Sequence, residues 1–294
     1  MADEGRVVAL DDGGELFVVE HGSGYPVMLL HGGPGLDHHE LTPWLDPLAD
    51  LGLRLIYVDM RGQGASPRVD PETLSVSVFA GDVDRLARAL GLDDYVLYGH
   101  SFGAIVTLGH ALERGSARCY IVSAGAASAS ALMEDVEREI ERFEPATMRE
   151  QIKRSWEQEA SVSTVQEARE LMESQMPFHF WEMGDAYRRF MERDETNYSP
   201  EVLAHFAQQG YGDFEWLDRL RWISKPMLVL VGRHERTCTV ARAEEIHQEV
   251  AGSKLVVIEK AAHMSFVEQP EAYRAAVRAW LVEQGILPDP AGAA

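Results

Sequence analysis

The sequence is poor in cysteine and in positive charge. It has two cysteines among its 294 residues, Cys119 and Cys238, which are too few for a disulfide framework. Its 27 lysine and arginine residues stand against 48 aspartates and glutamates, which gives a formal net charge of −21 at pH 7. Such a chain repels phosphate backbones and anionic lipid headgroups. We therefore expect no nucleic-acid or membrane partner, and a reducing, cytoplasmic setting.

Long apolar runs are also missing. The longest ones are far shorter than the roughly 18 residues that a membrane-spanning helix needs, and the acidic stretch Met1–Arg6 lacks the apolar core of a signal peptide. Apolar residues still make up 46% of the chain, which is ample for a large core. The length suits one α/β domain with an insertion, or two small domains.

Short apolar runs alternate with helical patterns along most of the chain. Apolar residues at a spacing of about 3.6 indicate a helix, whereas short runs bounded by turn residues are typical of strands. We expect strands at residues 6–10, 15–20, 26–30, 53–58, 95–98, 119–123, 226–232 and 254–258, and helices at 76–90, 104–112, 240–250 and 271–284. This alternation predicts an α/β fold with a mostly parallel sheet covered on both faces. Ligands bind such sheets at the carboxyl ends of the strands.

One long segment breaks the alternation. Between residues 126 and 223 no strand-like run occurs, and glutamate, arginine, methionine and aromatic residues recur at helical spacing. The segment is too long for a structureless loop. We therefore expect residues 1–125 and 224–294 to form the α/β core, and residues 126–223 to form an inserted helical cap over the functional site.

The motif Gly99-His-Ser-Phe-Gly103 lies between an expected strand and an expected helix. A strand that turns sharply into a helix leaves space only for very small residues on either side of the turn, and it lifts the central hydroxyl clear of the sheet. The free N–H groups at the start of the helix point to the same place. This context predicts that Ser101 is a nucleophile.

A serine nucleophile needs a base, and the base needs an acid that orients it. His263 follows the last expected strand and precedes the last helix, so its imidazole can reach back to Ser101. Glu235 follows the preceding strand, and the loop after Ser123 holds no carboxylate before Glu134. We expect Ser101, His263 and Glu235 to form a catalytic triad.

Two backbone N–H groups must also face the carbonyl oxygen that becomes negative during attack. The N–H of Phe102, at the start of the helix, is one candidate. The other is Gly33, in the glycine-rich loop His31-Gly-Gly-Pro-Gly35 that follows a buried strand. Bare glycine backbone can approach the reacting carbon closely. We expect Gly33 and Phe102 to form the oxyanion hole.

These motifs together resemble the α/β-hydrolase superfamily over essentially the whole chain, and its proline iminopeptidase branch in particular. The matching motifs are His31-Gly-Gly-Pro-Gly35, Asp59-Met-Arg-Gly-Gln-Gly64 followed by Ser66, and Gly99-His-Ser-Phe-Gly103. The resemblance implies a serine–histidine–acid triad, a helical cap between the sixth and seventh strands, and release of an N-terminal residue from small peptides. The chain departs from this branch at Glu235, where aspartate is usual, and at Phe102, where tryptophan is more frequent.

The resemblance also implies a cap carboxylate that binds the free α-amine of the substrate. The cap holds many candidates, and Glu182 follows the aromatic cluster Phe178-His-Phe-Trp181. An aromatic pocket with one carboxylate suits an amine ring such as proline. We expect Glu182, Trp181 and Phe178 to bind substrate. The alternative, that this cluster is ordinary core of the cap, stays open.

Two other functions remain open. A carboxylesterase or lactonase would use the same triad but would not require a free substrate amine. A non-catalytic ligand-binding protein would need neither the triad nor the oxyanion loop.

We expect no cofactor and no metal, because metal-ligating side chains are not grouped at a metal spacing, and the adjacent His38 and His39 cannot easily face one ion. For His31 and His100 we expect structural support or pocket lining beside the oxyanion hole, and not proton transfer.

Overall fold

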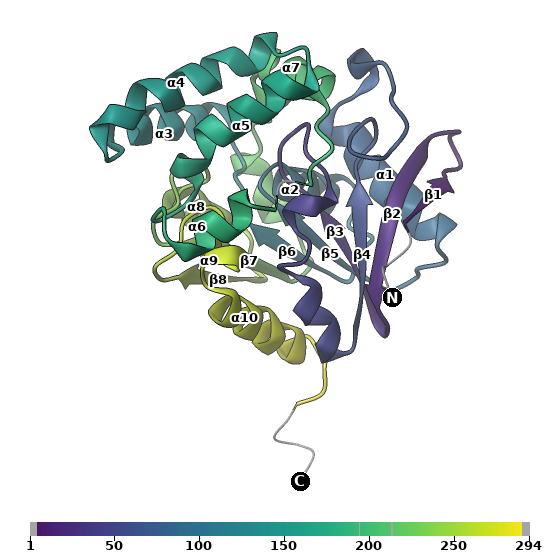
Figure 1. The fold of residues 1–294 in the computed structure, drawn as a ribbon. Helices are drawn as coiled ribbons and strands as arrows, with labels where there is room; N and C mark the ends of the chain where they lie inside the picture. Colours follow the sequence, from purple (N-terminus) through teal and green to yellow (C-terminus); the bar gives the residue numbers. More distant parts are fainter. Residues whose placement is uncertain (1–4, 194, 213, 290–294) are drawn as a thin grey trace.

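Residues 5–193, 195–212 and 214–289 are described by a computed structural model (Figure 1). They contain an eight-stranded sheet of order β1-β2-β4-β3-β5-β6-β7-β8. The strands are β1 (Arg6–Ala9), β2 (Glu15–Gly22), β3 (Tyr25–Leu30), β4 (Leu53–Asp59), β5 (Val96–His100), β6 (Cys119–Ser123), β7 (Met227–Gly232) and β8 (Ser253–Ile258). Strand β2 runs antiparallel to β1 and β4, and the other neighbours are parallel. The mostly parallel α/β sheet expected from the sequence is confirmed.

The central strands are mostly apolar because both of their faces are covered. Along β5, Leu97 packs into the hydrophobic core on one side of the sheet, while Val96 and Tyr98 pack into the core on the other side. Successive side chains of a strand point to opposite faces, so a strand covered on both sides is apolar on both. In β5 the polar residue His100 comes only at the last position.

Helices cover the two faces unequally. The helices α1 (Val76–Ala89), α2 (Phe102–Glu113) and α8 (Val240–Glu249) contribute to one core, whereas α9 (Ser265–Glu268) and α10 (Pro270–Glu283) contribute to the other. Helix α1 begins where the Ser75 side chain accepts a hydrogen bond from the Val78 N–H. Such a cap satisfies one of the free donors of the first turn.

The chain between β6 and β7 forms a helical layer. Its helices are α3 (Ala129–Arg142), α4 (Arg149–Gln158), α5 (Val165–His179), α6 (Asp185–Met191) and α7 (Pro200–Gln208). In Figure 1, α3, α4, α5 and α7 lie together above the sheet. Within the described part of this segment, the only β-type pairing is a single bridge between Ser128 and Glu215. We call residues 126–223 the cap.

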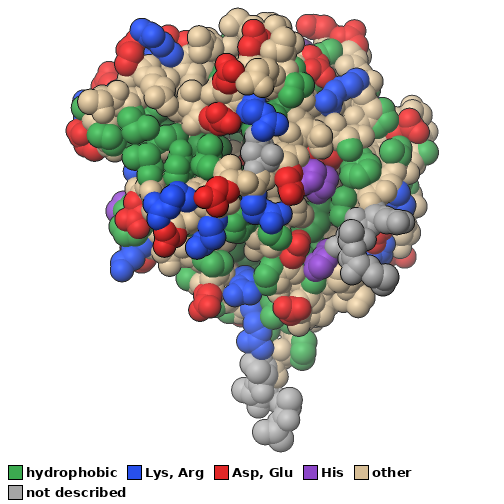
Figure 2. Space-filling view, viewed as in Figure 1, with side chains coloured by type: hydrophobic (Ala, Val, Ile, Leu, Met, Phe, Trp, Pro, Cys, Tyr) green, Lys and Arg blue, Asp and Glu red, His purple; other side chains and the backbone are tan. Residues whose placement is uncertain are grey.

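Three other features concern the cysteines, the surface and the lengths of the helices. Cys119 and Cys238 are both buried and free. Acidic and basic side chains are interspersed over the face shown in Figure 2. Among the described residues, no helix is both long and apolar enough to cross a membrane.

Candidate active site

Ser101 lies at the turn from β5 into α2 with a left-handed φ of 52°. A Cβ atom on Gly99 would lie 2.1 Å from the Gly103 carbonyl oxygen, and one on Gly103 would lie 2.4 Å from the Leu30 oxygen. Glycine is therefore required at both positions. The Ser101 N–H donates a hydrogen bond to the Ser123 carbonyl at 2.9 Å. This strained turn is the geometry that presents a serine hydroxyl at the edge of an α/β sheet.

His263 and Glu235 meet across two neighbouring loops, one after β8 and one after β7. The Nδ1 atom of His263 lies 2.8 Å from Oε2 of Glu235, and both side chains are buried. The other carboxylate oxygen, Oε1, accepts hydrogen bonds from the backbone N–H groups of Arg236, Thr237 and Cys238 at 3.0, 2.8 and 3.3 Å. Glutamate therefore reaches the position of an orienting acid, and the turn that follows it fixes the longer side chain.

The electrostatics of this pair favour its charged form. Burial by itself raises the pKa of Glu235, but the charge and hydrogen bond of His263, with the Thr237 N–H, hold that pKa below its usual value. Burial by itself lowers the pKa of His263, and the Glu235 charge and hydrogen bond reverse this, so the pKa of His263 is raised. Glu235 thus stays anionic and stabilises a proton on His263.

A cavity joins these side chains to Ser101. It measures about 720 Å³, is partly open to solvent, and lies between the α/β core and the cap. From the core it is lined by Gly33, Ser101, Phe102 and His263, and from the cap by Trp156, Glu159, Met172, Gln175, His179 and Tyr211. In the described part of the chain no hydrogen bond joins Ser101 to His263. Such bonds are often long without substrate and tighten in the complex.

The oxyanion loop, residues 31–35, is held in place from both ends. The Gly32 N–H donates to Oε2 of the buried Glu40 at 2.5 Å. The Gly35 N–H donates to Oε1 of the buried Gln63 at 2.6 Å. These two bonds leave little freedom for the backbone between them.

Gly33 and Phe102 line the cavity on either side of Ser101. Gly33 has a φ of +105°, which side chains rarely permit, so glycine is needed there. The Phe102 N–H is the first of α2 and has no acceptor within the helix. The structure thus brings both residues predicted for the oxyanion hole into the cavity that Ser101 lines.

Comparisons with known proteins agree with this geometry. The sequence profile of the alpha/beta hydrolase family matches residues 27–276. The chain belongs to this family. The proline iminopeptidase of Saccharolobus solfataricus is 28% identical over 271 residues, which cover 88% of this chain and 86% of that protein. The resemblance to proline iminopeptidases is therefore confirmed.

Solved structures show the same fold. The proline iminopeptidase of Mycobacterium smegmatis superposes with a TM-score of 0.73 at 20% identity, covering 96% of this chain and 98% of that one. An esterase of Thermogutta terrifontis superposes with a TM-score of 0.69 at 25% identity, covering 96% and 99%. This α/β-hydrolase thus shares its fold with proteins of both kinds.

The three cap residues predicted to bind substrate lie elsewhere. Phe178 is fully buried and packs on Phe143. Trp181 stacks on His234, with ring centroids 5.4 Å apart, and Glu182 is exposed. None of the three lines the cavity at Ser101. Helix α5 ends at His179, so Phe178 is fixed by the helix while Trp181 and Glu182 belong to the irregular stretch that follows it, and the three do not face one pocket.

The segment 178–181 instead ties the cap to the catalytic loops. The Arg236 guanidinium donates from Nη1 to the Phe178 and Phe180 carbonyls at 2.9 and 2.7 Å. The Glu268 carboxylate accepts from the Trp181 and Ala262 N–H groups, each at 2.7 Å. Arg236 follows Glu235 and Ala262 precedes His263, so the cap is fastened to both loops.

Two further histidines flank His263: His179, which lines the cavity and belongs to the predicted aromatic cluster, and His100, for which we expected structural support or pocket lining and which does not line the cavity. The ring of His100, from the core, lies 4.7 Å from the His263 ring, and the ring of His179, at the end of α5, lies 4.9 Å away. Burial lowers the pKa of His179 to about 3 and that of His100 well below its usual value. Both imidazoles are therefore neutral, and the flanking rings add no positive charge beside His263.

Glu159 is the cap carboxylate that the structure places in the cavity. It is buried, and it accepts hydrogen bonds from the Gln175 side chain at 2.5 Å and from the Tyr211 hydroxyl. Burial raises its pKa to about 7, against the smaller opposing effect of these two neutral donors. In the sequence it is one of many glutamates on polar helical faces, which is why no pattern singled it out.

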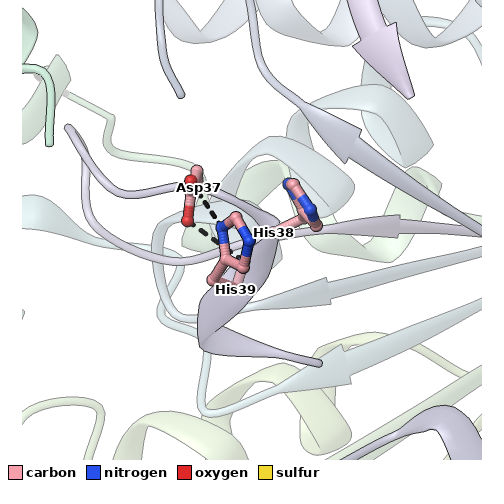
Figure 3. A group of neighbouring side chains, drawn as sticks. All are labelled: Asp37, His38 and His39. Carbon is pink, nitrogen blue, oxygen red and sulfur yellow. Dashed lines mark hydrogen bonds and ion pairs between the residues drawn. The ribbon is translucent and has the colours of Figure 1, made fainter. Parts of the chain in front are cut away.

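Figure 3 shows a group of metal-ligating side chains, Asp37, His38 and His39, next to the oxyanion loop. The two imidazoles lie 4.1 Å apart, closer than their adjacency led us to expect. However, Nδ1 of His38 already contacts Asp59 at 2.7 Å. Asp37 accepts bonds from His39 and from both the backbone and the side chain of Asn197. This group fastens the cap to the oxyanion loop, and the absence of a metal stays a prediction.

Proposed function

We propose that this α/β-hydrolase is a serine aminopeptidase of the proline iminopeptidase type. Ser101 Oγ attacks the substrate carbonyl carbon while His263 takes its proton. Glu235 orients the imidazole, and the Gly33 and Phe102 N–H groups stabilise the oxyanion. The leaving amine then receives the proton from His263. Water, activated by the same histidine, hydrolyses the acyl-enzyme and releases the N-terminal residue.

The observation that carries the substrate class is the position of Glu159. It is a buried cap carboxylate in the same apolar cavity as Ser101, and its two partners are neutral. A carboxylate whose charged form is poorly stabilised is a good receptor for a cation, and the ammonium of an N-terminal proline supplies one. The Trp156 ring packs against that of Tyr211, a partner of Glu159, and supplies an apolar surface that suits the pyrrolidine ring.

The test is paired turnover of prolyl-aminomethylcoumarin and its N-acetylated form. Hydrolysis of the free-amine compound alone would support the aminopeptidase. In Ser101→Ala we expect kcat to fall by about 10⁴-fold or more, because the covalent route is lost. Substantial residual turnover in that variant would contradict the mechanism.

A second candidate is a carboxylesterase or lactonase with the same triad. The apolar lining by Leu132, Ile105 and Met172 favours it, because such a wall would also hold an aliphatic acyl group. Turnover of p-nitrophenyl esters with no turnover of either prolyl amide would put this reading first. If a serine-directed phosphonate did not label Ser101, the result would instead favour a non-catalytic ligand-binding protein. We retain a cytoplasmic location as part of the proposal.

A further inference from the structure

A second cavity adjoins the one at Ser101. It measures about 570 Å³ and lies between the cap and the residues that follow the oxyanion loop. Four residues line both cavities and so form the wall between them: Leu36, Glu40, Met172 and Met176. We call this set the shared wall.

The shared wall lies on the His263 side of the active site. The Glu40 charge contributes to the raised pKa of His263. Oε1 of Glu40 is 4.0 Å from Nε2 of His100, whose ring packs against that of His263. Glu159, by contrast, interacts with Gln175 and Tyr211. Through Glu40 the second cavity therefore adjoins the His263 side of the first cavity, and Glu159 is not among its lining residues.

The reaction itself fixes what belongs on that side. The leaving amine must lie next to the histidine to receive its proton, so the part of the peptide beyond the scissile bond extends past His263. The acyl part extends toward Glu159. The two cavities thus match the two halves of a peptide divided at its first bond.

The lining of the second cavity is suited to a flat apolar side chain. The rings of Trp44 and Phe190 are stacked, with centroids 6.1 Å apart. Met172 and Met176 of the shared wall add apolar surface, and the charged residues Glu173 and Arg193 also line the cavity. Unbranched methionine side chains change rotamer easily, so this wall can open when a peptide spans both cavities.

We propose that the second cavity is the leaving-group subsite, and that it selects peptides with an apolar or aromatic residue in second position. This inference rests on the proposed function. Its substrate class is therefore short peptides with proline first and a residue such as phenylalanine, leucine or tryptophan next.

The experiment compares kcat/KM for Pro-Phe-amide and for prolinamide, which has no second residue. We expect the wild-type enzyme to prefer Pro-Phe-amide by at least about tenfold, the discrimination that a well-filled apolar pocket gives. In Phe190→Ala and Trp44→Ala this ratio falls toward one, and in Phe190→Leu it falls less. Trp222→Ala removes an exposed tryptophan that lines neither cavity. It serves as the matched control, and we expect its ratio to equal that of the wild type.

Titration of Ser101 with a small fluorophosphonate counts correctly folded sites in each preparation, so that misfolding is not read as lost selectivity. A ratio near one in the wild type, or a ratio that survives both alanine variants, would overturn the subsite and leave the aminopeptidase standing. No hydrolysis of either amide would overturn the aminopeptidase and the subsite together.

Discussion

The core and the cap each contribute a buried carboxylate to the site, and the two are held in opposite ways. Glu235, from the core, has a charged partner in His263 and backbone N–H groups around its other oxygen, so its pKa is lowered. Glu159, from the cap, has two neutral donors, and burial raises its pKa to about 7. The core thus stabilises the anionic form of Glu235 by itself, whereas the anionic form of Glu159 in the cap still needs a cation from the substrate to balance it.

This difference also separates chemistry from recognition. The core residues sit where strands end, and tight backbone contacts leave them little freedom. The cap residues sit on helices that pack over the site, and side chains such as Arg236, Glu268 and Asp37 fasten the cap to the core. A common catalytic core can therefore serve different substrates when the cap changes.

Removing the charge that the core stabilises should have the largest effect. In Glu235→Gln we expect kcat for prolyl-aminomethylcoumarin to fall by about 10³- to 10⁴-fold, because an amide no longer stabilises the protonated histidine or sets its tautomer. Glu235→Asp keeps the charge but shortens the reach, so its loss should be smaller. Equal losses in the two variants would show that length, not charge, governs this position.

Loosening the oxyanion loop should have an intermediate effect. Glu40→Ala removes the acceptor of the Gly32 N–H, and we expect kcat to fall by about tenfold with a smaller change in KM, because the loop matters most in the transition state. Glu40→Gln keeps an acceptor oxygen and should restore most of the activity. Activity in Glu40→Ala equal to that of the wild type would show that Gln63 alone holds the loop.

The pH dependence should differ between substrates that carry an amine and those that do not. The raised pKa of Glu159, about 7, means that it gains a proton as the pH falls through neutrality and then cannot bind an ammonium. For a prolyl amide, kcat/KM should fall in this range more steeply than for an ester, for which His263 alone must lose its proton. Parallel profiles for the two substrates would contradict a role for Glu159 in amine binding.

The smallest expected effect is that of Glu159→Gln on the free energy of unfolding, and its sign follows from the raised pKa of Glu159. The folded pKa of Glu159 lies above its unfolded value, so the stability it contributes is present below the unfolded pKa and is lost as the pH rises through about 7. Glu159→Gln should therefore be more stable than the wild type at pH 8, by about 1 to 3 kcal/mol, with little difference at pH 4. Thermal unfolding at the two pH values measures this. A destabilised variant at pH 8 would mean that Gln175 and Tyr211 stabilise the anion more than burial opposes it.

The sequence predicted the core half of the site because its geometry is local. Ser101, His263 and Glu235 each follow a strand, and a parallel sheet brings its strand ends to one edge. Gly33 and Gly99 are required by backbone contacts that a short motif already encodes. The strand and helix positions of the core were confirmed for the same reason, since apolar runs and turn residues mark them.

The cap half of the site could not be predicted in this way. The hydrogen-bond partners of Glu159 in the cavity, Gln175 and Tyr211, lie 16 and 52 positions away in the sequence. No local sequence pattern indicates a contact over such a separation. The aromatic cluster at 178–181 was chosen as a pocket because of its composition. In the structure His179 alone of this cluster lines the cavity, and the others pack in the cap or anchor it to the catalytic loops.

The central claim is that a core triad cleaves the bond while a cap carboxylate selects a free amine. The most direct measurement is the ratio of kcat/KM for prolyl-aminomethylcoumarin over its N-acetylated form, in the wild type and in Glu159→Gln. We predict a ratio of about 10² or more in the wild type, because a buried carboxylate without a cationic partner rejects the acetylated compound, and a ratio near one in the variant. A high ratio that is unchanged in Glu159→Gln, or a wild-type ratio near one, would contradict the account.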